Sequence, residues 1–179
     1  MDAMDATIPR RSIVDRMRGA AMFDVATYEE VEADTSATGQ AAVVVVLAAI
    51  AAAIGNAFRG GPGILGGLVS SLIGWAVWSG ITYIVGTRVF KGTATWGELL
   101  RTLGFAQAPG VLMVAAIVPV LGVLVKIVIW LWMLGTGIVA IRQALDFDTG
   151  KAVMTALVGW LASIVVFWVL AGIFGAALF

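Results

Sequence analysis

Side chains that could do chemistry are scarce in the apolar parts of this sequence. The chain has no histidine and no cysteine, which removes the commonest general base, the commonest metal ligand and the thiolate nucleophile. Its aspartates and glutamates all fall in polar segments outside the long apolar stretches, and none is paired with a base in a recognisable site. We therefore expect no catalytic residue, no metal site and no cofactor, and we do not expect an enzyme.

Gln107 is the polar side chain with the most unusual surroundings, because it shares an apolar stretch with Pro109 and Pro119. Prolines and an amide are tolerated inside a membrane where neighbouring helices or water satisfy the freed backbone groups. This stretch is therefore expected at the centre of a helical bundle, either as tightly packed core or as the lining of a cavity. Packing is the commoner use of such features.

Lys126 is the charge placed most clearly within an apolar span. It stands about one helical turn from a predicted turn at 119–122, so its alkyl stem could carry the ammonium to the near interface and a lipid headgroup. The alternative is an intramembrane cation that pairs with a substrate. The spans offer no acidic partner for such a role, so the sequence favours headgroup contact.

The elements that must position these residues are membrane helices. Hydrophobic residues make up 61% of the chain and charged residues 12%, with a mean hydropathy of +1.02, whereas a soluble domain carries roughly twice that charge. The predicted fold is all-α, a polytopic membrane bundle of five transmembrane helices behind a short cytoplasmic amphipathic segment. We expect a head at 1–40 and a membrane domain at 41–179, with spans at about 41–58, 64–86, 105–118, 123–141 and 154–177. The third span is short for a crossing, so it would be tilted, half-inserted or lengthened by the helix before it.

Small residues recur at helical spacing in the second span. One ridge contains Gly63, Gly67 and Ser71, and another contains Gly66, Ser70 and Gly74. Such ridges let helix backbones approach closely in lipid. We expect this packing within the bundle, with a homodimer seam as the alternative.

Three capping-box spacings predict helix starts, at Ser12 with Asp15, at Thr27 with Glu30 and at Thr95 with Glu98. The first would open an amphipathic helix whose Arg16 and Arg18 contact anionic lipid headgroups; a short solvated helix is an equal alternative. The third would open a helix that lies in the membrane interface and is stopped by Gly104.

The distribution of basic residues predicts the topology. The head, the loop after the second span and the loop after the fourth hold most of the arginines and lysines, whereas the opposite side holds Arg59 with Lys126 nearby. By the positive-inside rule the N-terminus is cytoplasmic and the C-terminus lies outside. The expected location is the plasma (inner) membrane.

Several segments together resemble the Yip-domain family of five-span membrane proteins, and in particular its prokaryotic members. They are Leu103–Gly110, Ile117–Gly122, Ile129–Trp130, Ala140–Asp146 and Thr149–Ala152, with Tyr28–Val31 and Asp34–Ala41 similar to the head of the prokaryotic members. The resemblance covers nearly the whole chain and implies a cytoplasmic head on a compact helical bundle. Eukaryotic members bind prenylated Rab-type GTPases, but the brief head here does not carry a GTPase partner over to this chain.

These observations favour a non-catalytic membrane scaffold or accessory subunit. Its partners would be membrane lipids and other integral membrane proteins or a larger membrane complex, reached through the apolar outer edges of the first and fifth spans, with no nucleic acid involved. The alternative is a small-molecule or lipid transporter with a cavity near Gln107 and Pro109. The sequence does not decide between a pore and a solid bundle.

Overall fold

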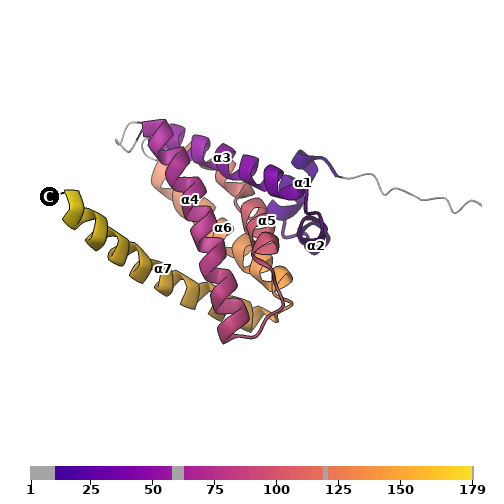
Figure 1. The fold of residues 1–179 in the computed structure, drawn as a ribbon. Helices are drawn as coiled ribbons and strands as arrows, with labels where there is room; N and C mark the ends of the chain where they lie inside the picture. The colour runs from indigo at the N-terminus through magenta and orange to yellow at the C-terminus, as the bar shows by residue number, and fades with distance from the viewer. Residues whose placement is uncertain (1–10, 58–62, 119–120, 179) are drawn as a thin grey trace, which may run out of the picture.

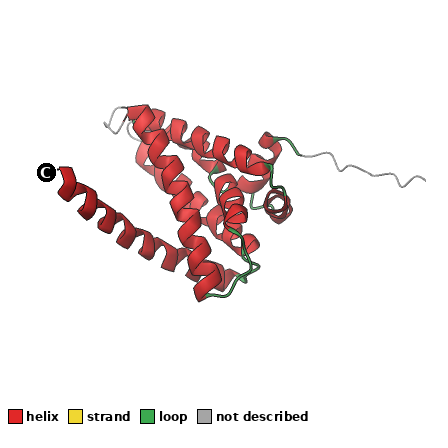
Figure 2. Cartoon of the chain, in the orientation of Figure 1, coloured by secondary structure: helices red, strands yellow, loops and turns green. Residues whose placement is uncertain are grey.

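The computed structural model describes residues 11–57, 63–118 and 121–178, and these residues form helices joined by turns and loops, with no strand among them (Figure 2). Two short helices, α1 (Ile13–Ala21) and α2 (Val25–Ala33), form the head. The bundle follows (Figure 1): α3 (Ala37–Gly55), α4 (Gly63–Ile84) continuing into a π-helical turn η1 (Val85–Val89), α5 (Trp96–Phe105), a 3₁₀ helix η2 (Ala108–Ile117), α6 (Gly122–Ala144) and α7 (Thr149–Leu178).

Five helical segments are long and apolar enough to cross a membrane, which confirms the predicted all-α polytopic class. They are Ala37–Gly55, Ile64–Val89, Trp96–Ile117, Gly122–Ala144 and Thr149–Val166. The third segment is 22 residues long because α5 and η2 join end to end through a short turn. The third span is thus lengthened by the helix before it, one of the possibilities that its short apolar stretch left open.

The helix that opens at Thr95 lies in the core of the bundle and continues into the third apolar segment, while its location in the membrane interface stays a prediction. Its capping box forms as expected, with Thr95 N donating to Glu98 Oε2 at 2.7 Å and Glu98 N donating to Thr95 Oγ1 at 3.3 Å. Leu99, Leu103 and Phe105 are buried, and so are 56% of the residues in the most apolar part of the third span. Because the most buried segment is the third, the bundle is built around α5 and η2.

Gly104 does not stop α5, which continues to Phe105. A Cβ added at Gly104 would lie 2.7 Å from the Cβ of Ala41, so the glycine lets α5 and α3 approach closely. Gly110 has a similar role in η2, where an added Cβ would lie 3.0 Å from the Cβ of Ala48 on α3. Both glycines are therefore explained by close helix packing, which leaves no room for a side chain, and not by a helix end.

The head is folded against the bundle by apolar burial. Tyr28 and Val31 of α2 are fully buried, in one cluster with Leu99 and Leu103 of α5. The Tyr28 hydroxyl lies 3.1 Å from the carbonyl oxygen of Ala20 and 3.3 Å from that of Thr136, so it can donate to α1 or to α6. The head is therefore part of the folded core.

The predicted helix starts in the head are partly confirmed. Ser12 caps α1, with its Oγ accepting from Asp15 N at 3.1 Å. The second prediction is wrong, because Asp24 caps α2 and Thr27 lies buried inside it. The chain reverses at Phe23, whose φ is 61°, so the helix begins just after this turn and earlier than the Thr27 spacing indicates.

The second and fifth spans lie at the periphery. Of the residues in the most apolar part of each span, only 6% are buried in the second and 17% in the fifth, compared with 33% in the first. Figure 1 shows α7 diverging from α4 towards its C-terminal end. The bundle thus has a packed centre and a loosely covered side formed by α4 and α7.

Candidate functional site

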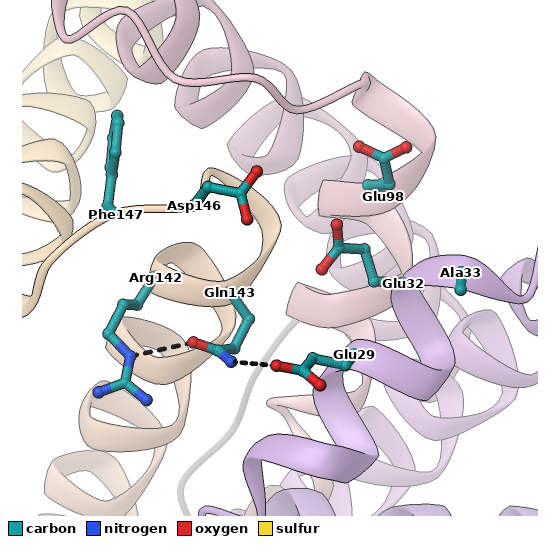
Figure 3. Close-up of a pocket in the computed structure, with 8 residues that line it drawn as sticks. All are labelled: Glu29, Glu32, Ala33, Glu98, Arg142, Gln143, Asp146 and Phe147. Carbon is teal, nitrogen blue, oxygen red and sulfur yellow. Dashed lines mark hydrogen bonds between the residues drawn. The ribbon is translucent and has the colours of Figure 1, made fainter.

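A polar pocket of about 490 Å³ opens where the head meets the bundle (Figure 3). Its walls come from the last turns of α2, the first turn of α5 and the C-terminal end of α6 with the loop that follows. The lining residues are Glu29, Glu32, Ala33, Glu98, Arg142, Gln143, Asp146 and Phe147. Four of these eight residues are carboxylates and one is an arginine, so the pocket is electronegative.

Several of the pocket side chains are fixed by hydrogen bonds. Arg142 Nε donates to Gln143 Oε1 at 3.1 Å, and Gln143 Nε2 donates in turn to Glu29 Oε1 at 3.2 Å (Figure 3). Asp146 Oδ2 accepts from the Thr93 hydroxyl at 2.7 Å. The chain from Arg142 to Glu29 connects α6 to α2 along the edge of the pocket.

Glu32 is the titratable group that this environment perturbs most clearly. Partial burial and the nearby carboxylates of Glu98 and Asp146 raise the pKa of Glu32 to about 7, against an opposing effect from Arg101. The Arg101 guanidinium does not pair with that carboxylate but donates to the backbone, with Nε at 2.9 Å from Val31 O and 3.1 Å from Glu32 O. Arg101 therefore holds α2 on α5 while leaving the charge of Glu32 poorly compensated.

The pocket lacks the arrangement of a metal centre. Among the described residues, no group of three or more His, Cys, Asp or Glu side chains is placed to hold a metal ion. What the arrangement can do is favour a cationic group or retain a proton on one of its carboxyls. Sequence reasoning missed this pocket; the signal available was that the head and the loops after the second and fourth spans, which the predicted topology places on one side of the membrane, also contain the acidic residues.

Arg16 is buried, so the predicted contact with lipid headgroups is wrong for this residue. Its Nε and Nη2 donate to Glu30 Oε1 at 3.1 and 2.9 Å, Nη2 also donates to Asp34 Oδ2 at 2.8 Å, and Nη1 donates to Gln40 Oε1 at 2.9 Å. The guanidinium thus joins α1, α2 and α3. A planar fork with several fixed donors suits arginine for such a position.

The Arg16 network also affects Asp34. Hydrogen bonds from Ser36 and then from Arg16 lower the pKa of Asp34 to about 2. The Ser36 hydroxyl and backbone N–H both donate to Asp34 Oδ1, at 2.5 and 3.0 Å. Asp34 therefore stays ionised at the join between the head and α3.

The two other predicted headgroup contacts keep their status as predictions. Arg18 is exposed on α1. Lys126, in the first turn of α6, is half-buried and donates to Asn56 Oδ1 at the end of α3, while Asn56 Nδ2 donates to Ala52 O at 2.7 Å. Lys126 therefore links α6 to α3, and an ammonium has further donors for a headgroup.

Gln107 and Pro109 lie where α5 turns into η2. Pro109 and Gly110 are buried, and Gln107 is half-buried. The Thr136 hydroxyl donates to Ala106 O at 2.7 Å, which satisfies a carbonyl at this turn. The segment is packed closely against α3 and α6, while Pro119 lies outside the described residues.

The predicted small-residue ridges of α4 are not packed within the bundle at Gly67 and Gly74. A Cβ added at Gly67 or Gly74 would meet nothing within 4 Å. Ser71, on the same ridge as Gly67, is half-buried, and Ser70 is exposed. The expected intramolecular packing is therefore absent at Gly67 and Gly74, which leaves these positions open to lipid or to another helix.

Comparison with known families was decisive for the identity of this fold. The profile of the Yip1 domain matches residues 23–171, which is well over half of the chain. The chain belongs to the Yip1 domain family. Searches of curated proteins and of solved structures give no match.

The Yip1 domain match runs from the turn before α2 into α7 and includes every residue of the acidic pocket. Yip1 domain proteins are membrane proteins, generally without enzymatic activity, that interact with other proteins in membranes. Helix α1 lies before the matched residues. Arg16 thus fastens a preceding helix to the Yip1 domain.

Proposed function

We propose that this protein is a non-catalytic membrane scaffold or accessory subunit that binds other integral membrane proteins through α4 and α7. In this proposal it lies in the plasma (inner) membrane with its N-terminus in the cytoplasm and its C-terminus outside. The observation that carries the proposal is on α4, where Gly67 and Gly74, two small residues suited to close helix contact, have open space beside them in the bundle.

The geometry of α4 supports contact with a helix of another protein more than contact with lipid alone. Gly67 and Gly74 lie seven residues apart and so share one face, and both have open space where a Cβ would stand. Glycine lowers intrinsic helix propensity by about 1 kcal/mol relative to alanine. A lipid-facing position gains nothing from that loss, whereas a helix partner gains closer backbone contact.

The packed centre gives the transporter alternative little support. An added Cβ at Gly110 would lie 3.0 Å from Ala48 Cβ and 3.3 Å from Met133 Sδ, so the surroundings of Pro109 resemble a protein interior more than a channel lining. The polar pocket described above lies at the head, and its lining does not include Gln107 or Pro109.

Mild-detergent purification from the native membrane, followed by mass spectrometry, tests the proposal. We expect a companion membrane protein in reproducible stoichiometry with the wild type, and its loss from a Gly67→Leu, Gly74→Leu double variant. The matched control is Val69→Phe with Ile73→Phe, which adds bulk at exposed positions on another face of the same helix. A wild-type protein that purifies without a companion would refute the proposal, as would a companion lost equally from both variants.

A further inference from the structure

A cluster of carboxyl groups at the joint between the head and the bundle has no role in the function proposed above. Glu32 comes from α2, Glu98 from α5 and Asp146 from the turn after α6, and all three line the same pocket (Figure 3). Helix α2 contacts the bundle through α5 and α6. A change of charge inside the pocket therefore acts directly across that contact.

We propose that the docking of α2 on the bundle is controlled by pH, with the Glu32 carboxyl as the group that binds and releases the proton. When Glu32 is protonated, its neutral side chain lies beside the carboxylates of Glu29, Glu98 and Asp146 without adding to their charge. When Glu32 is ionised, a fourth carboxylate shares the partly buried pocket, and the four repel one another. The C-terminal turn of α2 is then held less tightly.

The charges around Glu32 come from every element packed against it. Its own helix contributes Glu29, α5 contributes Glu98 and Arg101, and the end of α6 with its following turn contributes Arg142 and Asp146. The two arginines are already engaged, Arg101 with backbone carbonyls of α2 and Arg142 with Gln143. Burial of the Glu32 carboxyl is therefore the largest cause of its preference for the proton, and repulsion from the neighbouring carboxylates adds to it against the opposing charge of Arg101.

The direction of the effect follows from the raised pKa of Glu32, which is about 7 in the docked state against an ordinary 4.5. Since the docked state holds the proton more tightly, docking is strongest below the ordinary value and weakens as the pH rises from there to about 7. Above that range the effect is constant. Acidification on the head side of the membrane therefore tightens the head.

Three aspartates of the head do not titrate in this pH range. Hydrogen bonds lower the pKa values of Asp15, Asp24 and Asp34 below their ordinary value of 3.8. These groups stay ionised throughout a titration between about pH 5 and about pH 8. A change of docking within that interval therefore reports on the pocket.

Hydrogen–deuterium exchange on the full-length protein in lipid nanodiscs tests the proposal. After correction for the intrinsic pH dependence of exchange, we expect the protection of the last-turn amides of α2 to fall about tenfold between about pH 5 and about pH 7. A tenfold change corresponds to about one pKa unit, which is less than the full shift of Glu32 because solvent screens a partly exposed carboxyl. Amides of α4, which do not contact the pocket, serve as the internal reference.

Two variants separate Glu32 from its surroundings. Glu32→Gln should remove the pH dependence and keep the protection that the wild type has at low pH. Glu29→Gln, one turn earlier on the same pocket wall, should retain most of the dependence, because Glu29 makes the smallest of the contributions that raise the pKa of Glu32. Wild-type amides equally protected at both pH values, or an unchanged slope in Glu32→Gln, would overturn the proposal.

A second variant keeps the test decisive if Glu32→Gln disturbs folding. Asp146→Asn removes one repelling carboxylate without altering α2, and asparagine tolerates the φ of 54° at this position. We expect it to weaken the pH dependence. An infrared titration of the wild type should also show a carboxylic acid band lost near neutral pH, and its absence in the wild type would contradict the proposal.

Discussion

Replacing Arg16 with methionine would test whether the head is held by one buried guanidinium. The side chain of Arg16 is 1% exposed, and its acidic partners Glu30 and Asp34 are 28% and 15% exposed. Methionine keeps much of the apolar volume but removes every donor. It removes the arginine partner of both carboxylates and of the Gln40 amide, which leaves Glu30 with the exposed Arg11 and Asp34 with Ser36.

The cost follows from the burial of the partners. Removing one member of a buried ion pair costs about 3–5 kcal/mol, and the partial exposure of both carboxylates places this case at the lower end, about 3 kcal/mol. That free energy corresponds to roughly a hundredfold or greater change in an opening equilibrium. The opening concerned is local, because it separates α1 and α2 from α3 while the spans stay folded.

Amide exchange in lipid nanodiscs measures this opening. We expect the amides of α1 and α2 to lose about a hundredfold in protection in Arg16→Met, with no change in α4. Arg18→Met is the matched control, since Arg18 is exposed on the same helix, and it should change protection by less than about threefold. Equal protection in the two variants would refute the assignment of Arg16 as the residue that fastens the head.

Three further predictions concern the packing and ionisation of the same region. Gly104→Val places a side chain where even a Cβ would lie 2.7 Å from α3, so the thermal midpoint should fall clearly, whereas Gly137→Val, with nothing within 4 Å of its Cβ, should leave it nearly unchanged. Tyr28→Phe removes a buried hydroxyl that donates to a backbone carbonyl of α1 or of α6, and we expect a loss of about 1 kcal/mol in head docking by amide exchange. Because hydrogen bonds from Ser36 and Arg16 lower the pKa of Asp34 to about 2, its contribution to docking should be complete above its ordinary value of 3.8 and be lost as the pH falls towards about 2. An acid titration of head exchange in the wild type and in Asp34→Asn measures that contribution as the difference between the two curves.

Features set by neighbouring residues were predicted well from the sequence. The five apolar spans follow from composition and length alone. The caps at Ser12 and Thr95 depend on residues three positions apart, so the local pattern was sufficient. The Asp24 cap was missed because a favourable spacing also occurs at Thr27, and only the turn at Phe23 decides between them.

Features set by distant residues were not predictable in the same way. The partners of Arg16 lie 14 to 24 positions along the chain, and the backbone partners of Arg101 lie about seventy positions away. An arginine on a predicted amphipathic helix looks like a headgroup ligand until the surface that covers it is known. Gly104 was ambiguous for a related reason, because glycine marks both helix ends and close helix contacts.

The acidic pocket shows the same limit. Its carboxylates are ordinary surface residues in the sequence, and Glu32, Glu98 and Asp146 belong to three separate polar segments. The topology predicted that they share one side of the membrane, but not that three of them face one recess. Their convergence depends on the docking of α2 between α5 and the end of α6.

The 3₁₀ geometry of η2 changes how far the third span reaches. Ten residues of α5 advance about 15 Å at the rise of an α-helix, and ten residues of η2 advance about 20 Å at the longer rise of a 3₁₀ helix. Together they cover about 35 Å, compared with a hydrocarbon thickness of about 30 Å. A wholly α-helical η2 would be about 5 Å shorter. The chain thus extends its shortest apolar stretch by winding it more tightly, and a slender helix at the centre also leaves room for α3 and α6 to close around it.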